Sequence, residues 1–203
     1  MFRLFGQGSN HVVMKFESVE EAGVSTSGKG VSISVYYEVQ ASNEVIEDIK
    51  KCESVPTASV GITYNINGTE EEDKGYVDVK GSYAELFDYK ELPEGTYNIK
   101  VYVPETIEGD VEFCVYAYSP ETGGYTEEIG CYSTYSEAEE EAKKHDAVVA
   151  GELVNVVTSG SKEIDMGKVT IGPVEKKPTP PPPKKKEPIW YPGKFLKKFL
   201  GRG

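Results

Sequence analysis

The sequence predicts a mainly β protein: a single antiparallel β-sandwich of about eight strands, jelly-roll or immunoglobulin-like, with one or two short helices and an extended C-terminal tail. Three observations predict it. Several segments alternate apolar and polar residues with a period of two, which is typical of strands with one buried face. Turn-forming residues separate them, and 21 glycines and 14 tyrosines suit short strands. A run of proline and lysine follows the last segment.

Four segments carry the clearest strand pattern. Their alternating apolar residues are Val31, Ile33, Val35, Tyr37 and Val39; Val60, Ile62, Tyr64 and Ile66; Tyr97, Ile99, Val101 and Val103; and Val111, Phe113, Val115 and Ala117. Weaker strands are expected over His11–Val19, Gly75–Lys80, Val148–Val157 and Ile164–Ile171. The run Val148–Val157 is nearly continuous in apolar residues, which predicts a strand covered on both faces.

Glycine, proline and asparagine mark the connections between these strands. Turns are predicted at Leu92–Gly95, at Gly123-Gly124 and at Ile107–Asp110. Asn67-Gly68 predicts the tip of a hairpin, and we expect the acidic run Glu70–Asp73 to keep that loop in water.

One helix is predicted between the strands. Ser136 can cap its start, with Glu139 completing a capping box, and Glu139–Lys143 and Glu140–Lys144 are spaced for ion pairs. Its apolar side amounts to Ala138 and Ala142, so we expect light contact with the sheet. The segment Asn43–Lys51 predicts a second short helix, in which Val45, Ile46 and Ile49 supply an apolar side.

The residues that usually carry catalysis do not form a recognisable motif. The two histidines, His11 and His145, are interpreted as structural, and neither zinc-ligand spacing nor a nucleophile or phosphate-loop motif occurs. The acidic runs Glu70–Asp73 and Glu137–Glu141 lack the EF-hand pattern and are interpreted as solvated surface. We therefore predict a protein that is not an enzyme and that has no cofactor or metal.

The three cysteines, Cys52, Cys114 and Cys131, cannot all pair within one chain, and none forms a CxxC motif. We favour buried thiols, because a free cysteine packs as a small hydrophobe. A Cys114–Cys131 bridge across neighbouring strands is the alternative.

Charge divides the chain into two parts. Residues 175–203 hold nine Lys/Arg against two Glu, a net charge of +7, whereas the remaining 174 residues hold 13 Lys/Arg against 32 Asp/Glu, a net charge of −19. This asymmetry predicts an acidic sandwich domain over residues 1–173, a proline- and lysine-rich extended linker over 174–188 and a basic tail segment over 189–203.

The tail segment has the pattern of a short amphipathic helix. Phe195, Leu196, Phe199 and Leu200 fall on one face and Lys194, Lys197 and Lys198 on the other, after Trp190 and Tyr191. Two turns are too few for a stable helix in water, so we expect the segment to fold on a partner. We favour a groove on another protein subunit, with an anionic membrane surface as the alternative. A disordered, solubilising end remains open, and the acidic domain argues against nucleic acid.

Four tyrosines lie opposite the predicted core positions of their strands: Tyr36, Tyr102, Tyr116 and Tyr118. If these strands are neighbours, the tyrosines form a contact face. Three interpretations stay open: the face is covered by other elements of the chain, it packs against another subunit, or it binds a ligand such as a carbohydrate.

These features together predict a structural protein rather than a catalyst. The first ten residues lack the apolar region of a secretory signal, so we expect synthesis in the cytoplasm without export. A sandwich module anchored through an adhesive tail is typical of an assembly component, such as a virion capsid, vertex or spike protein. A soluble carbohydrate-binding module is the alternative. Abundant Glu and Lys also hint at a thermophilic source.

Overall fold

The structure, a computed structural model, describes residues 10–24, 30–172 and 180–181. These residues form a mainly β protein with one large antiparallel sheet, as the alternating pattern predicted. The strands are β1 (His11–Val24), β2 (Gly30–Gln40), β3 (Thr57–Ile66), β4 (Thr69–Lys80), β5 (Tyr83–Glu91), β6 (Gly95–Val103), β7 (Thr106–Ser119), β8 (Gly124–Tyr132), β9 (Ala147–Ser159) and β10 (Lys162–Ile171). The helices are α1 (Asn43–Lys51) and α2 (Tyr135–Ala142).

The strands pair in the order β10-β6-β3-β4-β5-β2-β1-β7-β8, and β9 pairs with the other edge of β7. The sheet thus contains ten strands instead of about eight, because β5 and β8 escaped the sequence analysis. Strand β7 pairs with three other strands: β1, β8 and β9. Its first residues pair with β1 and its later residues with β8 on one edge, while β9 follows the opposite edge from Thr106 to Ala117.

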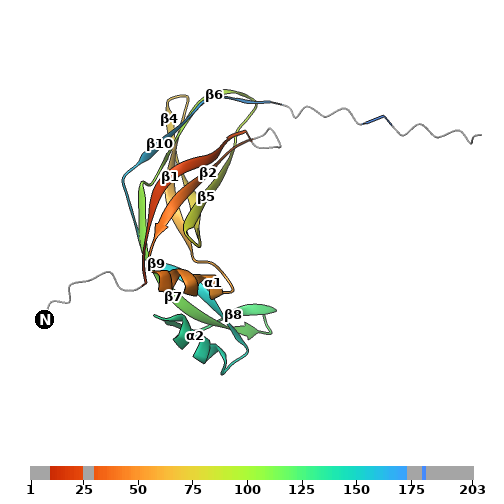
Figure 1. The fold of residues 1–203 in the computed structure, drawn as a ribbon. Coiled ribbons are helices and arrows are strands. Elements are labelled where there is room, and N and C mark those ends of the chain that lie inside the picture. Colours follow the sequence, from red (N-terminus) through yellow and green to blue (C-terminus); the bar gives the residue numbers. More distant parts are fainter. Residues whose placement is uncertain (1–9, 25–29, 173–179, 182–203) are drawn as a thin grey trace, which may run out of the picture. The chain divides into compact units, whose positions relative to one another are not determined.

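Four strands form a long two-stranded ribbon, in which β6 and β7 make one side and β9 and β10 the other (Figure 1). Strand β6 leads into β7 through Pro104 and Glu105, and β9 leads into β10 through Gly160 and Ser161. The pairing continues across this break, because Val103 lies opposite Lys162 and Thr106 lies opposite Ser159. Residues 95–117 are therefore matched to residues 147–171 in one nearly continuous antiparallel register.

The core lies on one face of the sheet. The alternating apolar positions of β2, β3 and β6 are buried as predicted, except that Tyr97 in β6 is half-buried, and β1, β4, β5 and β10 add further aliphatic residues. Tyr37 is fully buried within this core, packs edge-to-face with Phe16, and donates a hydrogen bond of 2.8 Å to the carbonyl of Pro104. This hydrogen bond thus links β2 to the Pro104-Glu105 connection between β6 and β7.

Three local predictions were wrong. Strand β9 is not covered on both faces: Val149 and Gly151 are buried, whereas residues 155–159 are exposed. Ile107–Asp110 is not a turn but part of β7, because β1 and β9 pair with its two edges. Glu70–Asp73 belongs to β4, which begins directly after the Asn67-Gly68 turn and stays paired with β3 although its side chains are exposed.

The other turn predictions are confirmed. Asn67 and Gly68 have φ values of 51° and 85°, as a tight hairpin requires, and Gly123 has a φ of 72°. Leu92–Gly95 connects β5 to β6 as predicted, and Tyr97 donates a hydrogen bond of 2.9 Å to the carbonyl of Pro93 there.

Helix α1 has the predicted bounds. Its N-cap is Ser42, whose side chain accepts a hydrogen bond from the backbone N–H of Val45, and it buries Val45 and Ile49. Among the described residues, neither helix has the length and apolar character needed to cross a bilayer.

Helix α2 begins two residues earlier than predicted and lies beside β7, β8 and β9 (Figure 1). Thr134 is the N-cap in place of Ser136, and its side chain accepts a hydrogen bond from the N–H of Glu137. Tyr135 packs edge-to-face on Phe113 and so fixes the first turn on the sheet. Lys143 pairs with Glu139 as predicted, but Lys144 pairs with Glu141 rather than with Glu140.

The preferred interpretation of the cysteines was wrong for two of the three. Cys114 in β7 and Cys131 in β8 lie directly opposite one another and form a disulfide. Cys52, just after α1, is a free thiol whose pKa is raised to about 11 by burial. The bridge joins β8 covalently to the strand that pairs with it.

Candidate contact face on the outer side of the sheet

The tail residues that the sequence singled out lie outside the described residues: Trp190, Tyr191, Phe195, Leu196, Lys197, Lys198, Phe199 and Leu200. The four predicted contact tyrosines lie within them. Tyr36 is in β2, Tyr102 in β6, and Tyr116 and Tyr118 in β7. Three strands separate β2 from β6, so the structure does not gather these four side chains into one face.

Three of these tyrosines have acidic or aromatic neighbours of their own. The Tyr102 hydroxyl donates to Glu163 at 3.2 Å, and burial together with this bond raises the pKa of Tyr102. The Tyr116 hydroxyl is hydrogen-bonded to Glu152 and to Glu128, and the Glu152 bond is the main cause that raises the pKa of Tyr116.

Tyr118 packs edge-to-face against Tyr125, with ring centroids 5.6 Å apart. Tyr125 in turn donates a hydrogen bond of 3.2 Å to Asp146. This pair is exposed, but it lies on β7 and β8, away from Tyr36.

Tyr36 instead belongs to a different group, which we call the tyrosine face: Tyr36 in β2, Tyr83 and Tyr89 in β5, and Tyr76 in β4. These strands are direct neighbours in the sheet. Each tyrosine alternates with buried core residues such as Val35, Val77 and Ala84, so all four point away from the core. Tyr76, Tyr83 and Tyr89 are 61%, 49% and 44% exposed, so this face presents aromatic surface to solvent.

Polar contacts hold the tyrosine face together. Tyr36 and Tyr83 pack edge-to-face at 6.1 Å. A hydrogen bond to Glu20 of β1 is the main cause that raises the pKa of Tyr36 to about 12. Between the rings, Ser34 donates to Glu85 at 3.1 Å.

Gly30 gives Tyr89 its place on this face. A Cβ at Gly30 would lie 2.8 Å from the hydroxyl oxygen of Tyr89 and 2.7 Å from the backbone oxygen of Lys90. The phenol end of Tyr89 therefore occupies the space that the side chain of a larger residue at position 30 would need.

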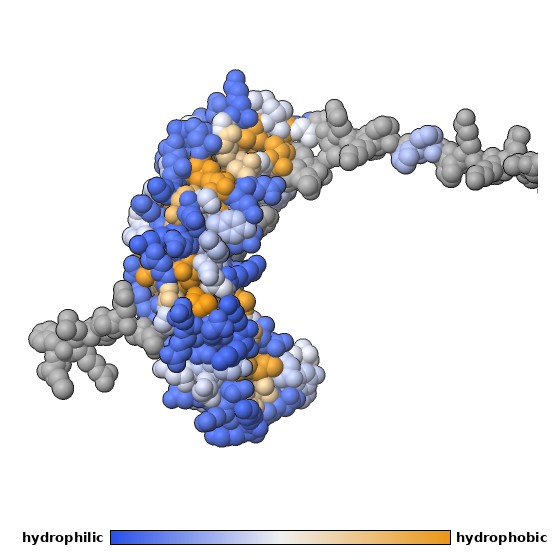
Figure 2. Space-filling view, viewed as in Figure 1, coloured by the Kyte–Doolittle hydropathy of each residue, from blue (hydrophilic) through white to orange (hydrophobic). Residues whose placement is uncertain are grey.

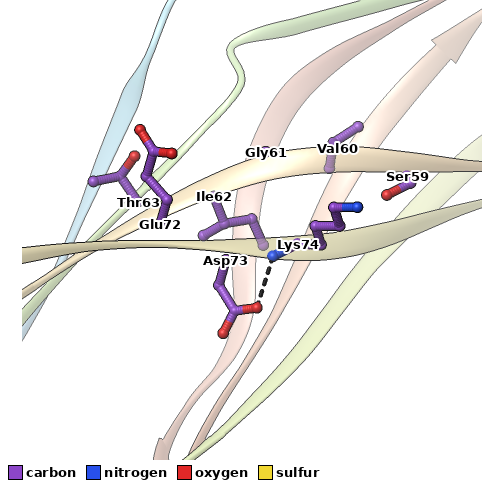
Figure 3. Close-up of a pocket in the computed structure, with 8 residues that line it drawn as sticks. All are labelled: Ser59, Val60, Gly61, Ile62, Thr63, Glu72, Asp73 and Lys74. Carbon is purple, nitrogen blue, oxygen red and sulfur yellow. Dashed lines mark hydrogen bonds between the residues drawn. The ribbon is translucent and has the colours of Figure 1, made fainter.

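An open hollow adjoins the tyrosine face where β3 pairs with β4. Its volume is about 570 Å³, and it is lined by Ser59, Val60, Gly61, Ile62, Thr63, Glu72, Asp73 and Lys74 (Figure 3). Ser59 lies opposite Tyr76 in the pairing, so the hollow continues the face. In Figure 3 the carboxylates of Glu72 and Asp73 point to opposite sides of β4, and Asp73 accepts a hydrogen bond of 2.8 Å from the N–H of Lys74.

This arrangement is suited to binding. Tyrosine rings offer flat apolar area and a hydroxyl, and they contact sugars or protein surfaces at small entropic cost. Elsewhere, Glu112, Cys114 and Cys131 bring potential metal-ligand atoms within 4.8 Å of one another. Both sulfurs are joined in the disulfide, so neither is available as a thiolate ligand.

The sequence analysis missed this face because it missed β5. In the segment Tyr83–Glu91 aromatic residues occupy the outward positions, so the contrast between apolar and polar sides is weak. Two signals could have found it. Lys80 and Tyr83 flank Gly81-Ser82, a two-residue connection in which Gly81 has a φ of 63°, and Ala84 and Leu86 keep the period of two.

Comparisons of this chain with protein-family models, with curated proteins and with solved structures find no match. Function must therefore be argued from the residues themselves.

Proposed function

We propose that this chain is a non-enzymatic structural protein: a β-sheet module anchored by its basic amphipathic tail in a larger assembly, such as a virion capsid, vertex, spike or similar surface component. The observation that carries the proposal is the segregation of charge. A net charge of −19 over residues 1–174 stands against +7 over residues 175–203. Opposite charges in one chain favour attachment to different surfaces, so the two parts have separate tasks.

The fold supports this division. Among the described residues, Ile171 in β10 is the last buried residue of the core. Of the described strands, β10 pairs only with β6, so the last described strand lies at an edge of the sheet. The surface in view is largely hydrophilic, with apolar areas over some of the strands (Figure 2). An acidic module of this kind remains in water while a separate segment provides attachment.

The proposed partners of the tail are other subunits of the assembly, with an anionic membrane surface as the competing partner. Repeated copies would turn a weak contact into firm attachment. The proposed place of synthesis is the cytoplasm, followed by incorporation into the assembly. A thermophilic source is part of the proposal, since intracellular disulfides are a feature of hyperthermophile proteins and Cys114 and Cys131 form one.

The test compares four proteins by size-exclusion chromatography with light scattering, with and without phosphatidylglycerol vesicles. They are the full chain, residues 1–173, a tail variant carrying Lys194→Glu, Lys197→Glu and Lys198→Glu, and a matched linker variant carrying Lys184→Glu, Lys185→Glu and Lys186→Glu. We expect the full chain and the linker variant to assemble without vesicles. Residues 1–173 and the tail variant should stay folded and should form nothing larger than a dimer. Assembly of residues 1–173 to the same extent as the full chain would refute the anchoring role.

Co-elution of the full chain with the vesicles, without self-assembly, would assign the tail to a membrane instead of a protein. Equal losses in the tail and linker variants would show that net charge alone drives attachment, without the amphipathic pattern.

A second candidate function is carbohydrate binding, and the tyrosine face is the observation that favours it. Tyr83 and Tyr89 are six residues apart on β5, about 20 Å at 3.4 Å per residue, which suits a chain of several sugars. Glu20 and Glu85 on this face disfavour anionic polysaccharides. Titration of neutral oligosaccharides against the full chain tests this function. Tyr76→Ala and Tyr83→Ala should abolish binding, whereas Tyr118→Ala, at an exposed tyrosine outside this face, should retain it.

We also propose that the sheet folds over as a sandwich of the jelly-roll or immunoglobulin-like type. Two observations support it: the core lies on one face, and β1 contacts β10 although six steps of pairing separate them. Methyl–methyl nuclear Overhauser effects between Ile33 in β2 and Ile99 in β6 would test it, and their absence would count against two layers.

A further inference from the structure

One edge of the sheet is open over most of a strand. Strand β9 pairs with β7 along its length, and its other edge is covered only at the start. There the N–H of Glu53 donates to the carbonyl of Val149 at 2.9 Å, and the N–H of Gly151 donates to the carbonyl of Ser54 at 3.1 Å. Beyond Gly151, no backbone group of the described residues bonds to this side of β9. We call residues 153–159 on this side the β9 edge.

The β9 edge is uncharged and rich in valine. Its sequence, Leu-Val-Asn-Val-Val-Thr-Ser, contains neither a charged residue nor proline. Val156 and Val157 are 36% and 63% exposed. Both face solvent because a bulge interrupts the alternation: Asn155 has a φ of 53°, and two residues, Asn155 and Val156, lie opposite the single Gly109.

The edges of β1, β8 and β10 are different, because each carries charge. Strand β1 beyond Phe16 contains Glu17, Glu20 and Glu21, β8 contains Glu127 and Glu128, and β10 contains Lys162, Glu163, Asp165 and Lys168. Charged side chains on an edge strand oppose pairing with another sheet. The β9 edge lacks this protection and has the β-branched composition that favours pairing.

We propose that two copies of this chain pair through their β9 edges, antiparallel, and so join their sheets into one. The inference rests on the proposed assembly role and supplies its contact between identical copies. A two-fold axis perpendicular to the sheet at Val157 places Val157 opposite Val157 of the second copy and Asn155 opposite Ser159. This register brings valine against valine and polar against polar, without setting like charges together.

The same chemistry argues for a second copy rather than for the basic tail of this chain. A basic segment would be drawn to an acidic edge, such as that of β1 or β8, and the β9 edge offers it no carboxylate. Self-pairing through β1 or β8 would in turn place glutamates near glutamates. Compared with the edges of β1 and β8, the β9 edge combines open backbone groups with a self-compatible sequence.

The test measures the oligomeric state of the full chain by analytical ultracentrifugation. We expect a reversible dimer, as the unit from which any larger assembly forms. Val157→Lys, which brings two cations close to the two-fold axis, should weaken the dimer by about tenfold or more. The matched control is Val24→Lys, the same exchange at an exposed valine of β1, which should leave dimerisation at the level of the unaltered chain. Circular dichroism should show that both variants stay folded, because both side chains are exposed.

Amide hydrogen exchange gives a second readout at the same site. Alternate amides of residues 153–159 should be protected in the unaltered chain at concentrations where it is dimeric, and should exchange faster in Val157→Lys. A monomer at all concentrations, or a dimer that Val157→Lys leaves intact, would overturn the proposal. If association is lost on deleting residues 174–203 but not in Val157→Lys, the tail is the contact: the β9 proposal fails while the anchoring proposal stands.

Discussion

At the scale of single residues, the Tyr37 hydroxyl is the polar group most deeply set in the core. It donates to the carbonyl of Pro104 at the break in the ribbon, and burial raises the pKa of Tyr37. Tyr37→Phe keeps the ring and its contact with Phe16 but leaves that carbonyl without its partner. We expect the variant to lose about 1–3 kcal/mol of unfolding free energy, measured by denaturant titration at pH 7.

The raised pKa also predicts how stability changes with pH. A tyrosine whose pKa is higher in the folded than in the unfolded state holds its proton longer when folded. Its contribution is therefore complete below the unfolded pKa of about 10 and is lost as pH rises above it. Unfolding free energy should fall between pH 10 and 11.5, and Tyr37→Phe should fall less steeply. Parallel slopes for the two proteins would show that Tyr37 does not titrate with unfolding.

Two adjacent glycines on β3 and β4 predict opposite responses to the same substitution. A Cβ on Gly75 would lie 2.3 Å from Cδ1 of Ile62 and 2.6 Å from Cδ1 of Leu86, inside the core. A Cβ on Gly61 would have no described atom within 4 Å. Gly75→Ala should therefore cost about 1–3 kcal/mol by overpacking. Gly61→Ala should be neutral or slightly stabilising, because alanine has less freedom in the unfolded chain. Thermal unfolding of both variants tests the contrast, and equal effects would contradict it.

At the scale of elements, helix α2 offers a direct comparison between two candidate caps. Thr134 accepts the N–H of Glu137 at 3.2 Å, whereas the sequence pattern pointed to Ser136. We expect Thr134→Ala to lower stability by about 1 kcal/mol and Ser136→Ala to change it little. The difference is measured by thermal unfolding and by exchange of the amide of Glu137. A larger loss for Ser136→Ala would restore the capping box that the pattern suggested.

Strand β8 depends on β7 for its attachment, by pairing and by the disulfide. The bridge closes a loop with a sequence separation of 17 residues, so the double variant Cys114→Ser/Cys131→Ser should lose about 3 kcal/mol. Hydrogen exchange should locate the fastest new opening in β8. Cys52→Ser serves as the control, since this thiol is unpaired and should leave β8 unchanged.

Elements with strong internal signals could be predicted from the sequence. Helix α1 was placed at its bounds because apolar residues recur on one face, and β2, β3 and β6 because their alternation is strict. The sequence patterns failed where contacts with residues distant in the sequence decide the local structure. The polar residues 70–73 are strand because β3 pairs with them, and Thr134 caps α2 because Tyr135 packs on Phe113.

The candidate site was predicted less well than the fold, for the same reason. Tyr36 was recognised as outward-facing, but its companions Tyr76, Tyr83 and Tyr89 depend on β5 lying between β2 and β4. Sequence spacing gives the side of a strand to which a residue points. It does not give the order of strands, which determines which outward residues meet.

At the scale of the whole molecule, the acidic excess predicts a response to salt. A net charge of −19 over residues 1–174 works against the compact state by self-repulsion. Sodium chloride shortens the screening length to about 10 Å at 0.1 M. The Tm of residues 1–173 should therefore rise between low salt and 0.1 M, measured by scanning calorimetry. The full chain should gain less, because its tail already offsets part of the charge. A falling Tm would show that attractive ion pairs outweigh the repulsion.

The ribbon of β6–β7 with β9–β10 also gives a tethered module a path for mechanical load. Tension on the chain beyond Ile171 enters β10 at its end. If the force acts along the strand, the backbone hydrogen bonds between β10 and β6 are loaded together, in shear. If the force acts across the strand, these hydrogen bonds break one after another, beginning at the pair Ile171 and Gly95. Because the register continues into β7 and β9, the force reaches the longest paired element of the molecule, and the direction of the pull decides how firmly the anchor holds.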